Sequence, residues 1–387
     1  MELPNVKVGL LFSLSGPYSS VSRAMAAGAG LAADEINSSG AYGFTIEMEH
    51  IDPKGELPQY MAATRHFLGE AGLKHVVGCY TSSSRKEIIP LFEKHDALLW
   101  YPSHYEGFET SENVVYSGAA PNQHIIPLAK YLLGQSRKRG WFIGSNYIWA
   151  WENNRIMREA LSSSTGGEVV GERYFPVGDT DVDDVVRQII ADRPDFIFAT
   201  LIGDSLYAFL EKLRLEAAGA GVDQPAEMPV VSCSLSEAEL PFIPEANDGH
   251  IVSSVYFSTI ETAENNSFTR AWSGRFAEMG EASCDTEATY FTIYLLAEAI
   301  RKAGTDAFEA VREAVRGLEF AAPQGRIRID PDNLHCRMRP RIGRSRRDGT
   351  FEIVYASPVP VNPDPYLTWT SEEEFSAHIT AGLKVIK

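Results

Sequence analysis

The chain has 387 residues, of which 44% are hydrophobic and 22% charged, a composition typical of globular proteins and long enough for two domains. Acidic residues outnumber basic residues by 52 to 35, and the formal net charge of -17 argues against a surface built to bind nucleic acid phosphates. The four cysteines are widely scattered, so neither a disulfide framework nor a zinc site is predicted.

The N-terminal residues lead directly into a predicted strand, without a basic segment and an apolar stretch ahead of it. Apolar runs are all shorter than the roughly 18 residues that a membrane span needs. We therefore expect a cytoplasmic protein without membrane insertion. A periplasmic location would require that a leader peptide ahead of the chain had been removed.

Short β-branched runs alternate with amphipathic segments along the first half of the chain, which is typical of βαβ units and a parallel sheet. Strands are predicted at 6–12, 44–51, 76–80, 97–101 and 114–116, and helices at 24–36, 60–68 and 86–94.

A second alternating series follows, with predicted strands at 140–143, 168–175, 195–200 and 230–233 and helices at 125–133, 153–161, 182–191 and 205–215. A further strand at 251–257 precedes helical segments at 268–279, 286–303 and 308–318, and hairpin-like segments at 325–329 and 339–354 end the regular part. The pattern predicts an α/β fold with two doubly wound, parallel-sheet lobes joined by crossover segments. We expect residues 1–120 with 251–330 in one lobe and 121–250 with 331–387 in the other.

Motifs of common enzymes are absent or out of context. Residues 28–33 match a loose Gly-x-Gly-x-x-Ala fingerprint, but they lie inside a predicted helix, where close helix packing explains the glycines better than a dinucleotide does. A nucleophile elbow, a Walker A loop and a His-Glu-x-x-His motif do not occur, and the nine histidines lack metal-ligand spacing. We expect no enzyme activity, no metal and no cofactor.

Polar and aromatic side chains follow three predicted strands, at the carboxyl ends where open α/β sheets bind ligands. Serines at 82–84 can cap a helix or donate to a bound polar group, and both interpretations remain open. Aromatic runs at 100–105 and 147–151 indicate a shared aromatic box. Such a box with hydroxyl groups suits a small neutral polar molecule, because an amino acid would need charged partners for its two ends.

These segments resemble the type I periplasmic-binding-protein family, and most closely its amide- and urea-binding branch, which includes an aliphatic-amide sensor that negatively regulates an amidase operon. The matching motifs are Val-Gly-Leu-Leu-Phe-Ser at 8–13, Gly-Cys-Tyr-x-Ser at 78–82, Tyr-Pro-x-x-Tyr-Glu-Gly-Phe-Glu at 101–109, Ala-Pro-Asn-Gln at 120–123, Ile-Gly-Ser-x-Tyr-Ile at 143–148, Ala-Pro-Gln-Gly at 322–325 and Pro-Asp-Pro-Tyr at 363–366.

The resemblance implies two lobes that close over a ligand like a flytrap. The residues that it places in the amide pocket are Tyr80, Ser82, Tyr101, Ser103, His104, Tyr105, Tyr147, Ile202 and Ser234. The chain departs from the family at Trp149 and Trp151, where Tyr-Pro-Arg is common, and at His104, where the sensor has proline and the urea binders have glutamine. A bulkier amide, a nitrile-derived amide and urea all fit this pattern.

The resemblance further implies a ligand sensor that regulates amidase-type gene expression by holding or releasing a partner, here an RNA-binding antiterminator protein. Self-association is also expected. The alternative function is the solute-binding protein of an ABC transporter for urea or short-chain amides. Six arginines at 337–347 form either the solvated face of a hairpin or a docking surface for the partner; they are Arg337, Arg339, Arg341, Arg344, Arg346 and Arg347.

Overall fold

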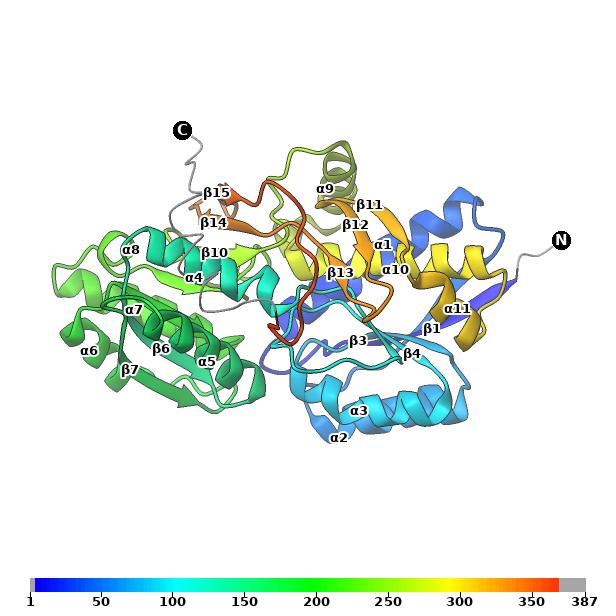
Figure 1. The fold of residues 1–387 in the computed structure, drawn as a ribbon, viewed down its shortest axis with the longest axis horizontal. Helices are drawn as coiled ribbons and strands as arrows, with labels where there is room; N and C mark the ends of the chain where they lie inside the picture. Colours follow the sequence, from blue (N-terminus) through cyan, green and yellow to red (C-terminus); the bar gives the residue numbers. More distant parts are fainter. Residues whose placement is uncertain (1–3, 369–387) are drawn as a thin grey trace.

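The computed structural model describes residues 4–368, which form two α/β lobes side by side (Figure 1). The first lobe is built on a five-stranded sheet in the order β2-β1-β3-β4-β5, in which all neighbouring strands are parallel. Its strands are β1 (Asn5–Leu11), β2 (Thr45–His50), β3 (His75–Gly78), β4 (Leu98–Tyr101) and β5 (Val114–Tyr116). The predicted doubly wound pattern is confirmed in this lobe.

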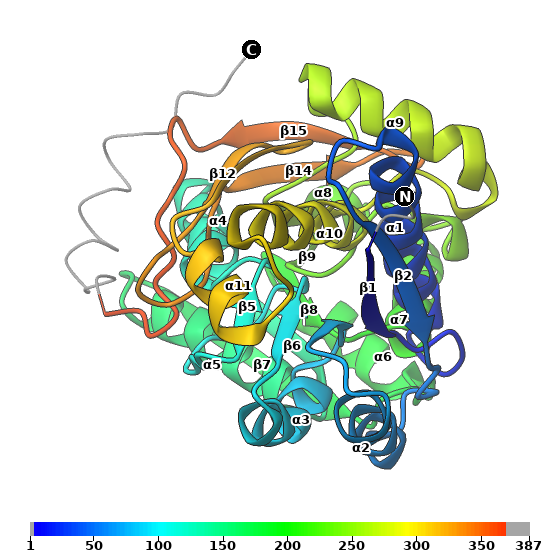
Figure 2. The same cartoon turned by 90° about the vertical axis from the view of Figure 1, so that its right-hand side faces the viewer.

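Helices cover both faces of the first sheet, and Figures 1 and 2 show α2 and α3 on one side and α10 on the other. These helices are α1 (Ser19–Ser39), α2 (Leu57–Arg65), α3 (Ser82–His95), α10 (Cys284–Ala303) and α11 (Phe308–Val315), with a π-helical turn at His66–Glu70 after α2. The glycines of the loose fingerprint serve packing, because a Cβ on Gly28 would lie only 2.7 Å from the carbonyl oxygen of Thr286 in α10. The prediction of close helix packing at this motif is therefore confirmed.

The second lobe is built on a seven-stranded sheet in the order β15-β14-β10-β9-β8-β6-β7. Its strands are β6 (Arg139–Ser145), β7 (Glu168–Phe175), β8 (Phe196–Thr200), β9 (Val230–Ser232), β10 (Ile251–Ser254), β14 (Arg341–Ser345) and β15 (Phe351–Ala356). Strands β14 and β15 form the expected antiparallel hairpin and join the sheet beside β10. The covering helices are α4 (Ile125–Gly134), α5 (Ile148–Ser162), α6 (Asp183–Asp192), α7 (Asp204–Gly219) and α8 (Gln224–Glu227), with short 3-10 turns at Pro121–Gln123 and Leu240–Phe242.

The chain crosses between the lobes three times, after β5, after β10 and after the last strand of a small third sheet. That sheet contains β11 (Glu319–Ala322), β12 (Gly325–Ile329) and β13 (Cys336–Arg337), and it packs on the core of the first lobe. Helix α9 (Ala263–Phe276) and a 3-10 turn at Ala277–Met279 follow the second crossing. The expected lobe boundaries at 251 and 331 differ from the sheets, since β10 pairs with β9 and β14 and β13 pairs with β12. The part of the expected second lobe beyond residue 368 lies outside the described residues.

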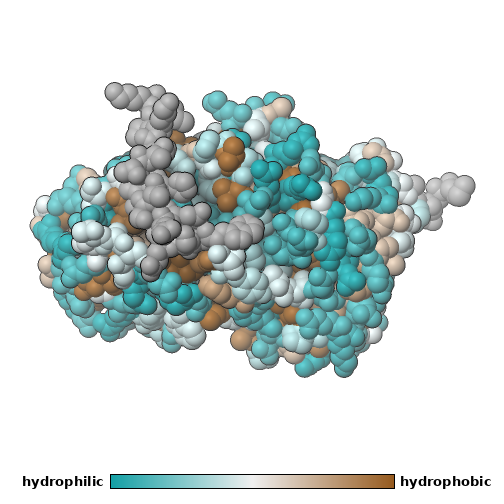
Figure 3. Space-filling view, in the orientation of Figure 1, coloured by the Kyte–Doolittle hydropathy of each residue, from teal (hydrophilic) through white to brown (hydrophobic). Residues whose placement is uncertain are grey.

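Within residues 4–368, no helix is both long and apolar enough to cross a membrane, and no cluster of three or more His, Cys, Asp or Glu side chains could hold a metal ion. The face of the molecule in Figure 3 is mostly hydrophilic, with apolar side chains in scattered spots. The large apolar side chains are concentrated in the cores on either side of the two main sheets.

Candidate functional site

A small cavity between the lobes, here called the aromatic chamber, lies at the carboxyl ends of strands from both sheets. It is lined by Tyr80, His104, Tyr147, Trp149, Ile202 and Ser234. The first two residues follow β3 and β4 of the first lobe, and the other four follow β6, β8 and β9 of the second lobe. Parallel strands bring these loops to one edge because their carboxyl ends point in the same direction.

The aromatic side chains of this chamber are held by packing. The rings of Tyr147 and Trp149 are stacked with centroids 6.2 Å apart, and the ring of His104 meets the Trp149 indole edge to face at 5.4 Å. Burial, as the largest cause, holds the pKa of both Tyr80 and Tyr147 well above the usual range, so both phenols remain protonated. The chamber therefore offers neutral hydroxyl groups on an aromatic frame.

One buried donor in this chamber has no partner within the described part of the chain. The indole Nε1 of Trp149 makes no hydrogen bond, although the residue is only 3% exposed. A buried N–H without an acceptor costs on the order of 1–3 kcal/mol. A ligand oxygen placed beside Trp149 would remove this cost.

The other four predicted pocket residues do not line the chamber. Ser82, Tyr101, Ser103 and Tyr105 are all buried in the first lobe. The Tyr101 hydroxyl donates to the carbonyl oxygen of Tyr80 at 3.2 Å, and the Ser103 hydroxyl donates to that of Cys79 at 3.3 Å. These side chains support the loops that carry the chamber, rather than facing into it.

Ser82, Tyr101 and Tyr105 instead contact a buried ion cluster around Arg85, which the sequence pattern did not reveal. The guanidinium is fully buried and contacts Glu106 at 3.2 Å and Glu109 at 2.7 Å. It lies over the rings of Tyr101 and Tyr105, at 4.6 and 4.7 Å from their centroids. The Ser82 hydroxyl donates to the Glu106 carboxylate, while Thr81 accepts from the Ser84 amide as the cap of α3. The cap is therefore Thr81 rather than one of the serines at 82–84, and the polar group that Ser82 binds belongs to the protein itself.

Two acidic side chains near the chamber were also missed by sequence analysis. Burial, and after it the interaction with Asp285, raises the pKa of Glu239 to about 8. Both carboxyl groups also raise the pKa of Tyr80, which places them within electrostatic reach of the chamber. The sequence carried no clear signal for Asp285, because acidic residues in the first turn of a helix are common for electrostatic reasons alone.

The lobes are in contact across the mouth of the cleft. The Ser20 hydroxyl at the start of α1 lies 2.7 Å from the Tyr207 hydroxyl on α7, and the guanidinium of Arg155 lies 5.0 Å from the ring centroid of Phe108. These residues come from opposite lobes, so the two lobes touch each other in this structure.

The arginine-rich segment is divided among different environments. Arg341 is 6% exposed and donates to the carbonyl oxygens of Val255 and Gln324, so it stabilises the crossover rather than a surface. Arg346 pairs with Glu352 at 3.3 Å on the surface of the hairpin. Arg344, Arg346 and Arg347 are exposed on the hairpin of β14 and β15, whereas Arg337 lies in β13 of the small third sheet. The use of the segment as a docking surface stays a prediction.

The fold and the cleft agree with the sequence comparison. A family model described as "Periplasmic binding protein domain" matches residues 6–372. The chain belongs to the periplasmic binding protein family. Because the family and the relatives named below are binding proteins, the prediction of a protein without enzyme activity is confirmed. The expected cytoplasmic location finds no support in this family.

Among curated proteins, the Leu/Ile/Val-binding protein homolog 6 of Brucella abortus is 23% identical over 340 residues, which cover 85% of each chain. A solute-binding protein of an ABC transporter from R. palustris, solved with 4-hydroxybenzoate, superimposes with a TM-score of 0.82 at 20% identity and covers 95% of this chain and 100% of its own. LivJ from Streptococcus pneumoniae, solved with isoleucine, gives a TM-score of 0.77 at 21% identity and covers 92% and 99%. These structures confirm the predicted fold, while the amide-binding branch stays a prediction.

Proposed function

We propose that this protein is the solute-binding component of an ABC uptake system and that its solute carries a primary amide. The transport assignment is supported by the relatives named above, which are binding proteins and include an ABC transporter component. It replaces the regulatory role as the main interpretation, and the location that goes with it is periplasmic. The amide assignment depends on the chemistry of the aromatic chamber.

The unpartnered Nε1 of Trp149 carries this assignment. An indole N–H only donates, so its ligand partner must be an acceptor such as a carbonyl oxygen. The hydroxyl groups of Tyr147 and Ser234 line the same chamber and can accept from an amide NH2 group. A primary amide has both functions in one small neutral group, so it can be buried with its hydrogen bonds satisfied.

A carboxylate suits this site less well. Within residues 4–368, neither Lys nor Arg lines the aromatic chamber, and the buried carboxyl groups of Glu239 and Asp285 lie nearby. A negatively charged ligand would be desolvated there without a cationic partner. The chain therefore differs in expected ligand from its relatives solved with 4-hydroxybenzoate and isoleucine.

Calorimetric titration of the full chain with acetamide, butyramide, urea, leucine and 4-hydroxybenzoate tests the proposal. We expect saturable binding of at least one amide, with leucine and 4-hydroxybenzoate silent. Binding of leucine or 4-hydroxybenzoate alone would overturn the amide assignment. If none of the five compounds binds, the amide assignment is overturned too.

A further inference from the structure

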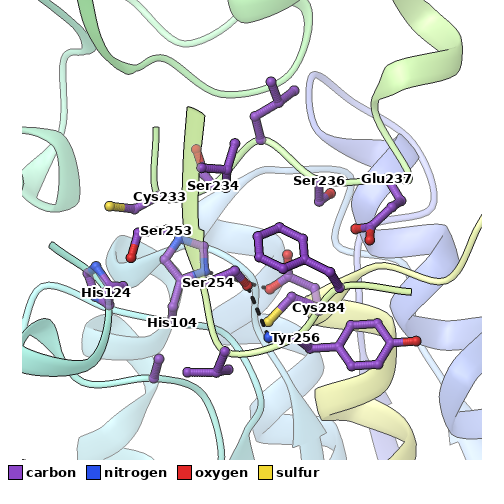
Figure 4. Close-up of a pocket in the computed structure, with 16 residues that line it drawn as sticks. His104, His124, Cys233, Ser234, Ser236, Glu237, Ser253, Ser254, Tyr256 and Cys284 are labelled. Atoms are coloured by element: carbon purple, nitrogen blue, oxygen red, sulfur yellow. Dashed lines mark hydrogen bonds and ion pairs between the residues drawn. The ribbon is translucent and has the colours of Figure 1, made fainter. Parts of the chain in front are cut away.

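A second cavity, here called the crossover chamber, lies behind His104 and beside two of the segments that cross between the lobes (Figure 4). Ala119 on the first crossing and Val255 on the second line it, together with the ends of β9 and β10 and the start of α10. It shares His104 and Ser234 with the aromatic chamber. The two chambers therefore lie next to each other, with His104 and Ser234 in the walls of both.

Two fully buried polar atoms of the crossover chamber have no partner within the described residues. They are Nδ1 of His124 and the hydroxyl oxygen of Ser253, on residues that are 1% and 0% exposed. Figure 4 shows both side chains on the same side of the chamber as His104. Native proteins satisfy nearly all buried polar groups, so two such atoms in one cavity point to an occupant.

The protonation state of the unpartnered His124 Nδ1 follows from the hydrogen bond that the other ring nitrogen makes. His124 Nε2 lies 3.0 Å from the carbonyl oxygen of Tyr105, which can only accept, so Nε2 carries the proton. Burial lowers the pKa of His124 to about 3, and the ring is neutral at physiological pH. Nδ1 therefore presents a lone pair and requires a donor.

The carboxyl side chains of this chamber can also accept a hydrogen bond from a donor. Asp285 lines it, with Oδ1 3.8 Å from Nδ1 of His104, and Glu237 lines it from the loop after β9. Within the described range 4–368, neither Lys nor Arg is among its lining residues. The unpartnered lone pair of His124 Nδ1 and the Asp285 carboxyl group, with no Lys or Arg among the described residues beside them, suit an N–H-bearing group.

The unfilled space of the chamber is on the order of one or two water molecules. An ammonium group has about this size. We propose that the crossover chamber holds an amine at the far end of the solute, so that the solute is an ω-amino amide rather than a simple aliphatic amide. This inference rests on the proposed function, which places the amide group in the aromatic chamber.

The test compares butyramide with 4-aminobutanamide, which differ only by the terminal amine, in calorimetric titrations of the full chain. We expect the amine to tighten binding about tenfold or more, as a charge-assisted hydrogen bond does. The gain should disappear in Asp285→Asn, which removes the carboxylate, and in Ser253→Val, which fills the chamber with two methyl groups and keeps a residue suited to a strand.

A matched control is Ser205→Val, because Ser205 is also fully buried with an unpartnered hydroxyl but does not line the crossover chamber. We expect this variant to keep the gain from the amine, and thermal denaturation checks that each variant folds. Equal affinity for the two amides in the natural sequence would overturn the inference and indicate that ordered water fills the chamber, while the amide assignment would stand. A gain that survives in both chamber variants would also overturn it. Failure of both amides to bind would remove the proposed amide ligand itself.

Discussion

The main-chain amide of Asp204 donates a hydrogen bond of 3.1 Å to the carbonyl oxygen of Pro17, across the mouth of the cleft. Pro17 lies in the loop after β1 of the first lobe, and Asp204 begins α7 in the second lobe. The residue between β8 and this helix, Gly203, has φ 59° and ψ -136°, a conformation that favours glycine. A Cβ at Gly203 would lie 1.8 Å from the Pro17 oxygen, so the contact requires a glycine for steric reasons as well.

Gly203→Ala is expected to prevent full closure and to weaken ligand binding by at least about tenfold, because the added methyl group occupies the position of the Pro17 carbonyl. Small-angle scattering with and without ligand measures the closure, and calorimetry measures the affinity. Gly221→Ala is the control, since Gly221 also has a positive φ, 70°, but nothing lies within 4 Å of its added Cβ. Unchanged affinity and unchanged ligand-induced compaction in Gly203→Ala would contradict the role of this contact in closure.

The two tryptophans of α5 should respond differently to substitution. Trp149 is 3% exposed in the aromatic chamber, whereas Trp151 is 44% exposed and donates from Nε1 to Asn146 at 3.1 Å. Trp149→Phe should lower amide affinity about tenfold through the lost hydrogen bond and abolish the fluorescence change on binding. Trp151→Phe should leave both nearly unchanged. A reversed pattern in parallel fluorescence and calorimetric titrations would place the ligand outside the aromatic chamber.

Substitution of Arg85 is expected to have a large effect on the stability of the protein, because this side chain is the centre of a buried ion cluster. Arg85→Met should lower the free energy of unfolding by about 3–5 kcal/mol, because it leaves the buried Glu106 carboxylate without its main partner. Adding Glu106→Gln should recover part of this loss, since the amide carries no buried charge. Urea denaturation measures both effects, and Arg158→Met, which breaks a half-exposed pair with Glu172, should cost less than about 1 kcal/mol. Similar losses for Arg85→Met and Arg158→Met would argue against the cluster as a main support of the first lobe.

Buried glutamates predict that the protein loses stability as the pH rises from 6.5 to 8. Burial raises the pKa of Glu237 from 4.5 to about 8, so the folded protein keeps a proton that the unfolded chain releases above about pH 4.5. Its stabilising contribution is complete below pH 4.5 and is lost as the pH rises toward 8. The expected fall between pH 6.5 and 8 is on the order of 1 kcal/mol for this group.

Buried histidines change the stability in the opposite direction, but they do so mainly below the range of pH 6.5 to 8. Burial lowers the pKa of His75 and His250 to about 4, so these groups destabilise the fold mainly below pH 6.5, where the unfolded chain takes up protons. Urea denaturation at pH 6.5, 7.2 and 8 should show a shallower fall for Glu237→Gln than for the natural sequence. Glu211→Gln, on the exposed face of α7, should leave the slope unchanged. Parallel slopes for all three proteins would show that Glu237 does not bind this proton.

The order of the elements could be predicted from the sequence because each strand and helix carries its own periodic pattern. The alternating series, the helix over the loose glycine fingerprint and the hairpin of β14 and β15 all follow from local spacing and turn residues. The lobe boundary near residue 251 was placed incorrectly relative to the sheets, since β10 pairs with both β9 and β14. Pairing partners depend on contacts far apart in the chain, and no local pattern encodes them.

The candidate site could be predicted only in part. Strand ends indicated Tyr80, His104 and Tyr147, which line the aromatic chamber because parallel strands place their carboxyl ends at one edge of the sheet. The same argument could not separate these residues from Tyr101 and Tyr105, which follow or end the same strands but turn toward Arg85. Which way a side chain turns depends on the neighbours that the tertiary structure supplies.

The sequence by itself determined the alternation of strands and helices, the absence of a catalytic motif and the family to which the chain belongs, since all three are written in local patterns. Only the tertiary structure decided which aromatic side chains face the cleft. It also brought His124, Ser253 and Asp285 together around one cavity, although more than 100 residues separate the first from the second. Burial then gives these groups their chemistry, because a polar atom removed from water must find its partner in the protein or in a ligand.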